Sequence, residues 1–177
     1  MVAVLLLGLF GYGIRHGARA GATSETSVIP PPPLRKSVAV LGFHNTSGRV
    51  GDAWLGTALS EMLSTELAGG EELRLVSGED VANLRQSSPW SQTGTLDQST
   101  TEHLGAALST DLLVLGSYTT IGTSERGQLR LDVRLQDAKT GEILTQVAET
   151  GSVSDLFHIA SRAGEIVRAW PGQIARI

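Results

Sequence analysis

The side chains best placed to do chemistry follow the first apolar run of the sequence. They are His44, Asn45, Ser47 and Arg49, in a loop that also contains Gly48. If the run before them is a strand and the segment after them is a helix, the loop lies where a strand leads into a helix N-terminus. α/β proteins often bind anions and other ligands at such a place. These four side chains are therefore the candidate ligand or partner contacts.

The rest of the sequence offers no catalytic, cofactor or metal motif. The loop lacks the GK[ST] of a P-loop, and its glycines do not form GxGxxG. The four histidines have no metal-ligand spacing, and GxSxG, HExxH and kinase signatures are absent. The absence of cysteine excludes thiol catalysis, disulfides and cysteine-ligated zinc. We therefore expect a domain that is not an enzyme and that holds no cofactor.

Composition describes a globular, mildly acidic chain. Of its 177 residues, 41% are hydrophobic and 18% are charged, and the formal net charge is −4. Nucleic-acid binding needs a basic face, whereas this chain has only two lysines, Lys36 and Lys139. We expect no nucleic acid as a partner.

Residues 1–33 differ from the remainder. Residues 1–14 are apolar and uncharged after Met1, and residues 15–33 form a linker that ends in four prolines, which favour an extended polyproline II spacer. The apolar run is shorter than the about 20 residues that span a bilayer. It is interpreted as a partial transmembrane helix. The alternative is an atypical signal peptide that is cleaved before Gly21.

Residues 34–170 predict one small α/β domain, followed by a tail at 171–177. Helices between the first three strands require crossovers and parallel pairing, and the final hairpin adds antiparallel strands. The domain is thus a mixed sheet with helices packed on it. The expected order is β-α-β-α-α-β-β-β-α, with strands at 37–43, 73–76, 112–118, 129–137 and 142–150.

The helices are predicted from apolar spacing and caps. Asp52 is the expected N-cap of the first, which buries a face that includes Trp54. Ser77, Ser99 and Ser152 are the expected N-caps of the other three. The third is expected to turn Leu104, Ala107 and Leu108 inward, and the last to end at Pro171-Gly172.

Four segments carry a resemblance to a known family. They are KSVAVLGFHNTSG (36–48), WLGTALSEMLSTEL (54–67), TDLLVLGSY (110–118) and LRLDVRLQDAKTGE (129–142). They resemble the extracytoplasmic α/β domain of bacterial single-pass membrane signalling proteins. Those proteins carry a eukaryotic-like Ser/Thr kinase or a winged-helix regulator, commonly with tetratricopeptide (TPR) repeats. The domain is also similar to the TolB N-terminal, FlgO and CsgG class.

The resemblance implies a non-catalytic sensor or protein-interaction module at the inner membrane, with the domain in the periplasm. Its partner would be an envelope protein or an adjoining TPR domain, and the N-terminal segment would hold it to the membrane. The sequence shows no kinase, winged-helix or repeat segment, so a fragment is expected. The alternative is an exported envelope assembly factor of the TolB or FlgO type. The lack of a lipobox cysteine sets this chain apart from the lipoprotein relatives.

Overall fold

The computed structural model describes residues 35–87, 90, 95–122 and 127–174, with side chains up to 170. The expected membrane segment (1–14) and linker (15–33) lie outside the described residues and stay predictions. Among the helices within the described ranges, none is both long and apolar enough to cross a bilayer.

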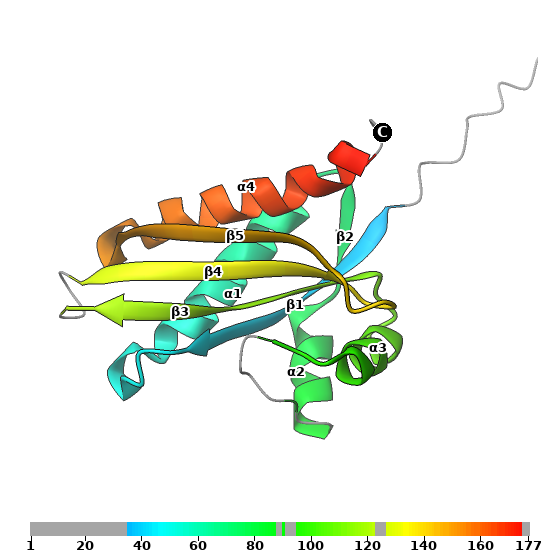
Figure 1. Ribbon diagram of the computed structural model, residues 1–177, viewed down its shortest axis with the longest axis horizontal. Helices are drawn as coiled ribbons and strands as arrows, with labels where there is room; N and C mark the ends of the chain where they lie inside the picture. The colour runs from blue at the N-terminus through cyan, green and yellow to red at the C-terminus, as the bar shows by residue number, and fades with distance from the viewer. Residues whose placement is uncertain (1–34, 88–89, 91–94, 123–126, 175–177) are drawn as a thin grey trace, which may run out of the picture. The chain divides into compact units, whose positions relative to one another are not determined.

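The domain is built on a five-stranded mixed sheet (Figure 1). The strand order is β2-β1-β3-β4-β5. β1 pairs in parallel with β2 and β3, and β3-β4-β5 is an antiparallel meander. The predicted mixed sheet is therefore confirmed. The elements are β1 (Lys36–Asn45), the short 3-10 helix η1 (Val50–Asp52), α1 (Trp54–Ala68), β2 (Leu73–Leu75), α2 (Gly78–Ser87), α3 (Gln98–Ala107), β3 (Leu112–Ile121), β4 (Gln128–Asp137), β5 (Ile143–Ser152), the 3-10 helix η2 (Val153–Asp155) and α4 (Leu156–Ile174).

α1 and α4 cover one face of the sheet and enclose the main core. Their buried side chains recur at helical spacing and meet the four leucine and valine side chains on one side of β4, which are fully buried. α2 and α3 pack on the other face, against β1 and the first half of β3. They form a smaller second core, which includes Ala39, Leu41, Val81, Leu104, Leu113 and Leu115.

The start of α1 differs from the prediction. Asp52 is not a helix N-cap, because η1 precedes α1 and Ala53 occupies the cap position without a side-chain hydrogen bond. The Asp52 carboxylate is buried and accepts a hydrogen bond from Thr120 of β3. Trp54 is 53% exposed, because it lies about 100° around the helix from the buried Leu55.

Two other helix ends also differ. Asp97, not Ser99, is the N-cap of α3, and its carboxylate accepts from the Thr100 N–H at 2.8 Å. Of the three side chains of α3 that are expected to point inward, Leu104 is buried and Leu108 is half-buried, but Ala107, the last residue of the helix, is exposed. α4 continues through the expected stop at Pro171 to Ile174, so the domain reaches into the predicted tail. A proline inside a helix removes its own N–H donor and crowds the carbonyl four residues earlier, yet the helix continues past Pro171 here.

Candidate functional site

Asn45, the last residue of β1, and the loop that follows it share several polar contacts. The Asn45 side chain accepts from the Ser47 N–H at 2.9 Å and donates to the Arg49 carbonyl at 2.9 Å. The Ser47 hydroxyl also donates to Asn45. This is the turn-forming use of an asparagine side chain. The structure therefore gives Asn45 and Ser47 a role in shaping the loop, and their contact with a ligand stays a prediction.

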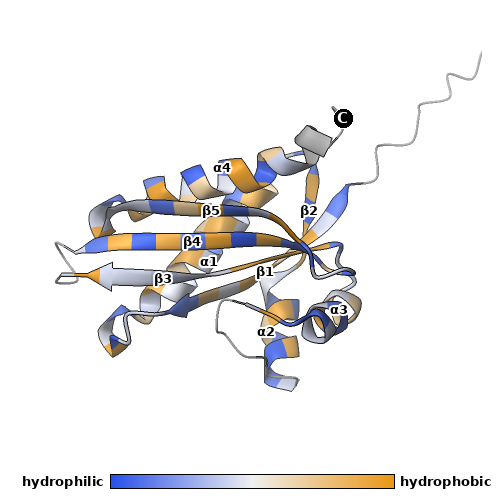
Figure 2. Ribbon diagram, in the orientation of Figure 1, coloured by the Kyte–Doolittle hydropathy of each residue, from blue (hydrophilic) through white to orange (hydrophobic). Residues whose placement is uncertain are grey.

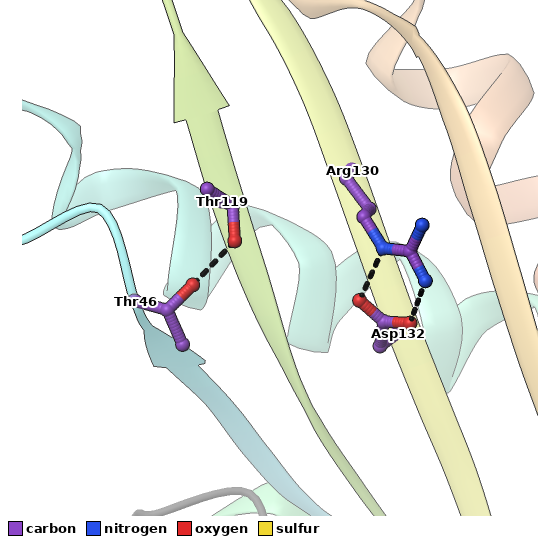
Figure 3. Close-up of polar contacts among 4 residues, drawn as sticks. All are labelled: Thr46, Thr119, Arg130 and Asp132. Atoms are coloured by element: carbon purple, nitrogen blue, oxygen red, sulfur yellow. Dashed lines mark hydrogen bonds and ion pairs between the residues drawn. The ribbon is translucent and has the colours of Figure 1, made fainter.

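Further hydrogen bonds tie the loop to the end of β3 and to the residue that follows it. The Thr46 N–H and hydroxyl both donate to the Tyr118 carbonyl at 2.9 Å, and the Thr46 and Thr119 hydroxyls are hydrogen-bonded (Figure 3). The Arg49 guanidinium donates to the Gly122 carbonyl. The loop is thus anchored to the sheet.

His44 belongs to a different surface. It pairs in register with Ser117, and both are half-exposed on the side of the sheet away from α1 and α4. Beyond α2 and α3, the described helices leave this side open. We call it the exposed sheet face, and define it as Ser117 and Thr119 of β3, Arg130, Asp132 and Arg134 of β4, and Gln146, Ala148 and Thr150 of β5.

The centre of the exposed sheet face is a charged pair on β4. Arg130 and Asp132 are joined by two hydrogen bonds of 2.9 Å between the guanidinium and the carboxylate (Figure 3). The hydrogen bond to Asp132 raises the pKa of Arg130. Figure 2 shows the alternation of hydrophilic and hydrophobic residues along β4 that puts this pair opposite the core. Sequence alternation predicted the polar side of β4, but the contributions of β3 and β5 required the strand pairing.

A cavity of about 320 Å³ lies beside β1, between α1 and α2. β1 bulges there at Gly42, whose φ of +115° favours glycine. The Arg85 guanidinium donates to the Leu41 carbonyl and lies 5.0 Å over the Trp90 ring. Burial lowers the pKa of Arg85. No local sequence pattern points to Arg85, because its partner Leu41 on β1 lies 44 residues earlier in the chain.

A second cavity, of about 540 Å³, lies at the amino ends of β1 and β3. Ser37 and Asp111 stand in its wall and bond reciprocally. The Asp111 carboxylate accepts from the Ser37 N–H at 2.9 Å and from the Ser37 hydroxyl at 2.8 Å. The bond from the Ser37 N–H, helped by the hydroxyl and by Lys139 and Lys36, lowers the pKa of Asp111 against the opposing effect of burial.

This pair gives the protein a pH-dependent contribution to stability. Because folding lowers the pKa of Asp111, its carboxylate stabilises the fold above its ordinary pKa, and this is lost as the pH falls through the folded value. We expect Asp111→Asn to lower the free energy of unfolding by about 1 kcal/mol at pH 7. The difference from the parent protein should vanish in acid. Urea denaturation of the full chain between pH 7 and pH 2 measures it.

The control is Glu142→Gln, which removes one exposed negative charge without such partners. An Asp111→Asn difference that persists unchanged at pH 2 would contradict the assignment.

No group of three or more His, Asp or Glu side chains in the described part of the chain is placed to hold a metal ion. The histidines at 44, 103 and 158 lie on separate elements, β1, α3 and α4.

Comparison with known proteins finds solved structures with a similar fold. No protein-family model matches the sequence, and no curated protein matches it. The LpoB C-terminal domain from Salmonella enterica is similar in structure, at 17% identity and a TM-score of 0.50, over 66% of this chain and 82% of that one. Lipoprotein GNA1162 from Neisseria meningitidis has 18% identity and a TM-score of 0.47, over 79% and 96% of the two chains.

TolB from Acinetobacter baumannii is the third of these structures. It has 15% identity and a TM-score of 0.42, over 80% of this chain and 28% of that one. All three are envelope proteins, and none of the three is kinase-linked. At sequence identities this low, a structural likeness shows the fold alone. Of these three structures, the LpoB C-terminal domain has the TM-score that supports a shared fold, and this chain has the same α/β architecture.

Proposed function

We propose that this chain is a non-catalytic protein-interaction domain of the bacterial cell envelope, in an exported factor that binds its partner through the exposed sheet face. The observation that carries the proposal is the two-sided character of β4. Leu129, Leu131, Val133 and Leu135 are fully buried on one side, while Arg130 is exposed and Asp132 and Arg134 are half-exposed on the other.

The charged pair on this face adds little to stability. The side chain of Arg130 is 56% exposed, and exposed ion pairs contribute at most about 1 kcal/mol. Arginine is enriched in protein interfaces, where its planar guanidinium makes several directed contacts. A flat, polar strand face with arginine at its centre therefore suits recognition of another protein better than enclosure of a small molecule.

The loop after β1 extends this surface. His44 lies next to Ser117 of the exposed sheet face, and the hydrogen bonds from Thr46 and Arg49 fix the loop beside the end of β3. In this proposal His44 and Arg49 contact the rim of the partner, while Asn45 and Ser47 hold the loop in the shape that presents them.

Site-specific photocrosslinking tests the partner surface. With a photoreactive amino acid at Thr150, the full chain in its native envelope should give one defined adduct, identified by mass spectrometry. Arg130→Ala should weaken binding of the purified, identified partner about tenfold, because a central arginine is a typical binding hot spot. Arg74→Ala, which removes an exposed arginine from β2, is the matched control.

A photoreactive residue at Glu79 of α2, outside the exposed sheet face, should not give the same adduct. If Glu79 gives it and Thr150 does not, or if Arg130→Ala and Arg74→Ala behave alike, the partner binds elsewhere.

The exported factor and the kinase-linked sensor differ at the N-terminus. The fold shared with the LpoB C-terminal domain supports an envelope protein, and the kinase-linked resemblance has no counterpart among the three structures compared. An exported and released factor would have a mature chain that starts at Gly21. Mass spectrometry of the protein from its native envelope decides this, because an intact hydrophobic N-terminus would favour the single-pass sensor.

A further inference from the structure

The sheet leaves a notch along the outer edge of β1, beyond the end of β2. β2 has three residues and pairs with Lys36–Val38, whereas β1 continues to Asn45 (Figure 1). Among the described residues, no strand pairs with β1 on this side after Val38. The cavity of about 320 Å³ between α1 and α2 lies in this notch, along Val40 to Phe43. Its volume is at the lower end of the range for small-molecule sites, about 300–1000 Å³.

Arg85 brings a positive charge to this cavity without a matching negative charge. Its Nη2 donates to the Leu41 carbonyl, and its Nε is buried without a hydrogen-bond partner. No Asp or Glu side chain in the described part of the chain forms an ion pair with it. The Trp90 ring, 5.0 Å away, compensates only a part of the charge. Because a charge that leaves water unpaired is costly, the guanidinium is suited to receive an anion from outside the chain.

The bulge of β1 places a glycine between Arg85 and Ser60 of α1. A Cβ on Gly42 would lie 3.1 and 3.8 Å from the two terminal nitrogens of Arg85, and 3.8 Å from the Ser60 hydroxyl oxygen. The guanidinium and the hydroxyl therefore border the same small space, and this space is open because residue 42 has no side chain. A ligand oxygen in it would lie within or close to hydrogen-bond distance of both groups.

The two groups ask for different partners. The Ser60 hydroxyl already donates to the Gly56 carbonyl at 2.8 Å, so its lone pairs remain for a donor on the ligand. The guanidinium can only donate, and its planar fork matches a carboxylate. A carboxylate on Arg85 with a hydroxyl group beside it, donating to Ser60, uses both. Thr57 and Ser64 of α1 add two further hydroxyl groups to the lining of the cavity.

Glu61 limits the charge of such a ligand. Its exposed side chain also lines the cavity, and no cation in the described residues forms an ion pair with it. A carboxylate at this place repels a second negative charge on the ligand, and it can accept hydrogen bonds from ligand hydroxyl groups. One arginine and one glutamate therefore favour a singly charged, hydroxyl-rich molecule over a phosphate dianion.

We propose that this cavity binds a small monocarboxylate rich in hydroxyl groups, of the sugar-acid class. The carboxylate accepts from Arg85, a neighbouring hydroxyl donates to Ser60, and another hydroxyl donates to Glu61. The cavity lies at the β1 edge, whereas the exposed sheet face is formed by β3, β4 and β5. This goes beyond the proposed function and does not depend on it.

NMR titration of the isotope-labelled full chain with D-glucuronate tests the site. The amide signals of Gly42 and Ser60 and the indole signal of Trp90 should shift and saturate, with a Kd of about 1 mM for a ligand of this size. D-Glucose is the matched control ligand, because it carries a hydroxymethyl group where glucuronate has the carboxylate. It should bind about tenfold more weakly or less. Equal affinities, or shifts confined to residues outside the cavity, would overturn the proposal.

Arg85→Gln removes the charge from the cavity. It should raise the Kd for glucuronate about tenfold or more, because it removes the charge-assisted hydrogen bonds. Arg74→Gln, which replaces an exposed arginine of β2 outside the cavity, is the matched control and should keep the parent Kd. The proposal fails if the two variants bind glucuronate equally well.

Ser60→Ala tests the second contact without touching the bond from Arg85 to β1. The loss of one hydrogen-bond acceptor should raise the Kd for glucuronate about fivefold. A parent-like Kd for this variant would contradict the assigned contact, even if Arg85→Gln disturbs the fold. Inorganic phosphate is the competing ligand. If it shifts the same signals with a lower Kd than glucuronate, the site is not one for a monocarboxylate.

Discussion

Leu63→Ala is expected to lower the free energy of unfolding by about 3 kcal/mol. Leu63 is fully buried in the middle of the α1 face that faces the sheet and α4. A Cβ on Gly164 of α4 would lie 3.7 Å from its Cδ1, so the two helix backbones approach closely at this point. Because close backbones can collapse little further, most of the cavity left by the missing methyl groups should remain. Urea or thermal denaturation of the full chain measures the loss.

Thr65→Ala is the matched control on the same helix. Thr65 is exposed and donates only to the carbonyl of Glu61 one turn earlier, so its loss should change stability by about 0.5 kcal/mol or less. If Leu63→Ala behaves like this control, α4 does not cover α1 as described.

Gly116→Ala is the second large effect that we expect, at about 3 kcal/mol or more. Gly116 is buried in the middle of β3. A Cβ there would collide with the Asp132 carbonyl on β4 and would lie 3.1 Å from Cε1 of Phe43. The obstruction is backbone on one side and a core ring on the other, so β3 and β4 must separate to admit it. Overpacking of a rigid core typically costs about 1–3 kcal/mol, and a blocked strand pair belongs at the upper end.

Gly51→Ala is the control for the general effect of replacing a glycine. No atom lies within 4 Å of a Cβ at Gly51, and its φ is outside the left-handed region. Its stability should stay within about 0.5 kcal/mol of the parent protein. Because β4 carries Arg130 and Asp132, Gly116→Ala should also weaken the partner binding proposed above. Equal denaturation midpoints for the two glycine variants would refute the close β3–β4 approach.

Sequence pattern predicted the elements whose physics is local. The alternation along β4 comes from side chains that point to opposite faces of a strand, and the structure confirms it from Leu129 to Leu135. The face of α4 from Leu156 to Val167 is confirmed for the same kind of reason. Such patterns depend on a residue and its near neighbours in the sequence, so they do not depend on which distant segments pack nearby.

Sequence pattern was less successful where a distant segment competes for a polar group. Asp52 is a residue type that is common at helix N-caps. Its carboxylate instead accepts a hydrogen bond from Thr120, and its backbone carbonyl accepts one from the Tyr118 hydroxyl. Both partners lie on β3, 68 and 66 residues further along the chain. Asn45 and Ser47 bond to each other and to the loop backbone, a role that their residue types alone do not specify, and their contact with a ligand stays a prediction. A polar residue type does not reveal which partner it will meet.

The sequence by itself therefore determined the class of the domain, its main core faces and the polar side of β4. Only the tertiary structure decided which polar side chains share a surface, because Ser117, Arg130 and Ala148 come together through strand pairing across more than thirty residues. Within the described residues, it also decided that β5 is an edge of the sheet, since an edge is the absence of a neighbouring strand and no single strand sequence records it. The exposed sheet face that we propose as the contact surface depends on these pairings.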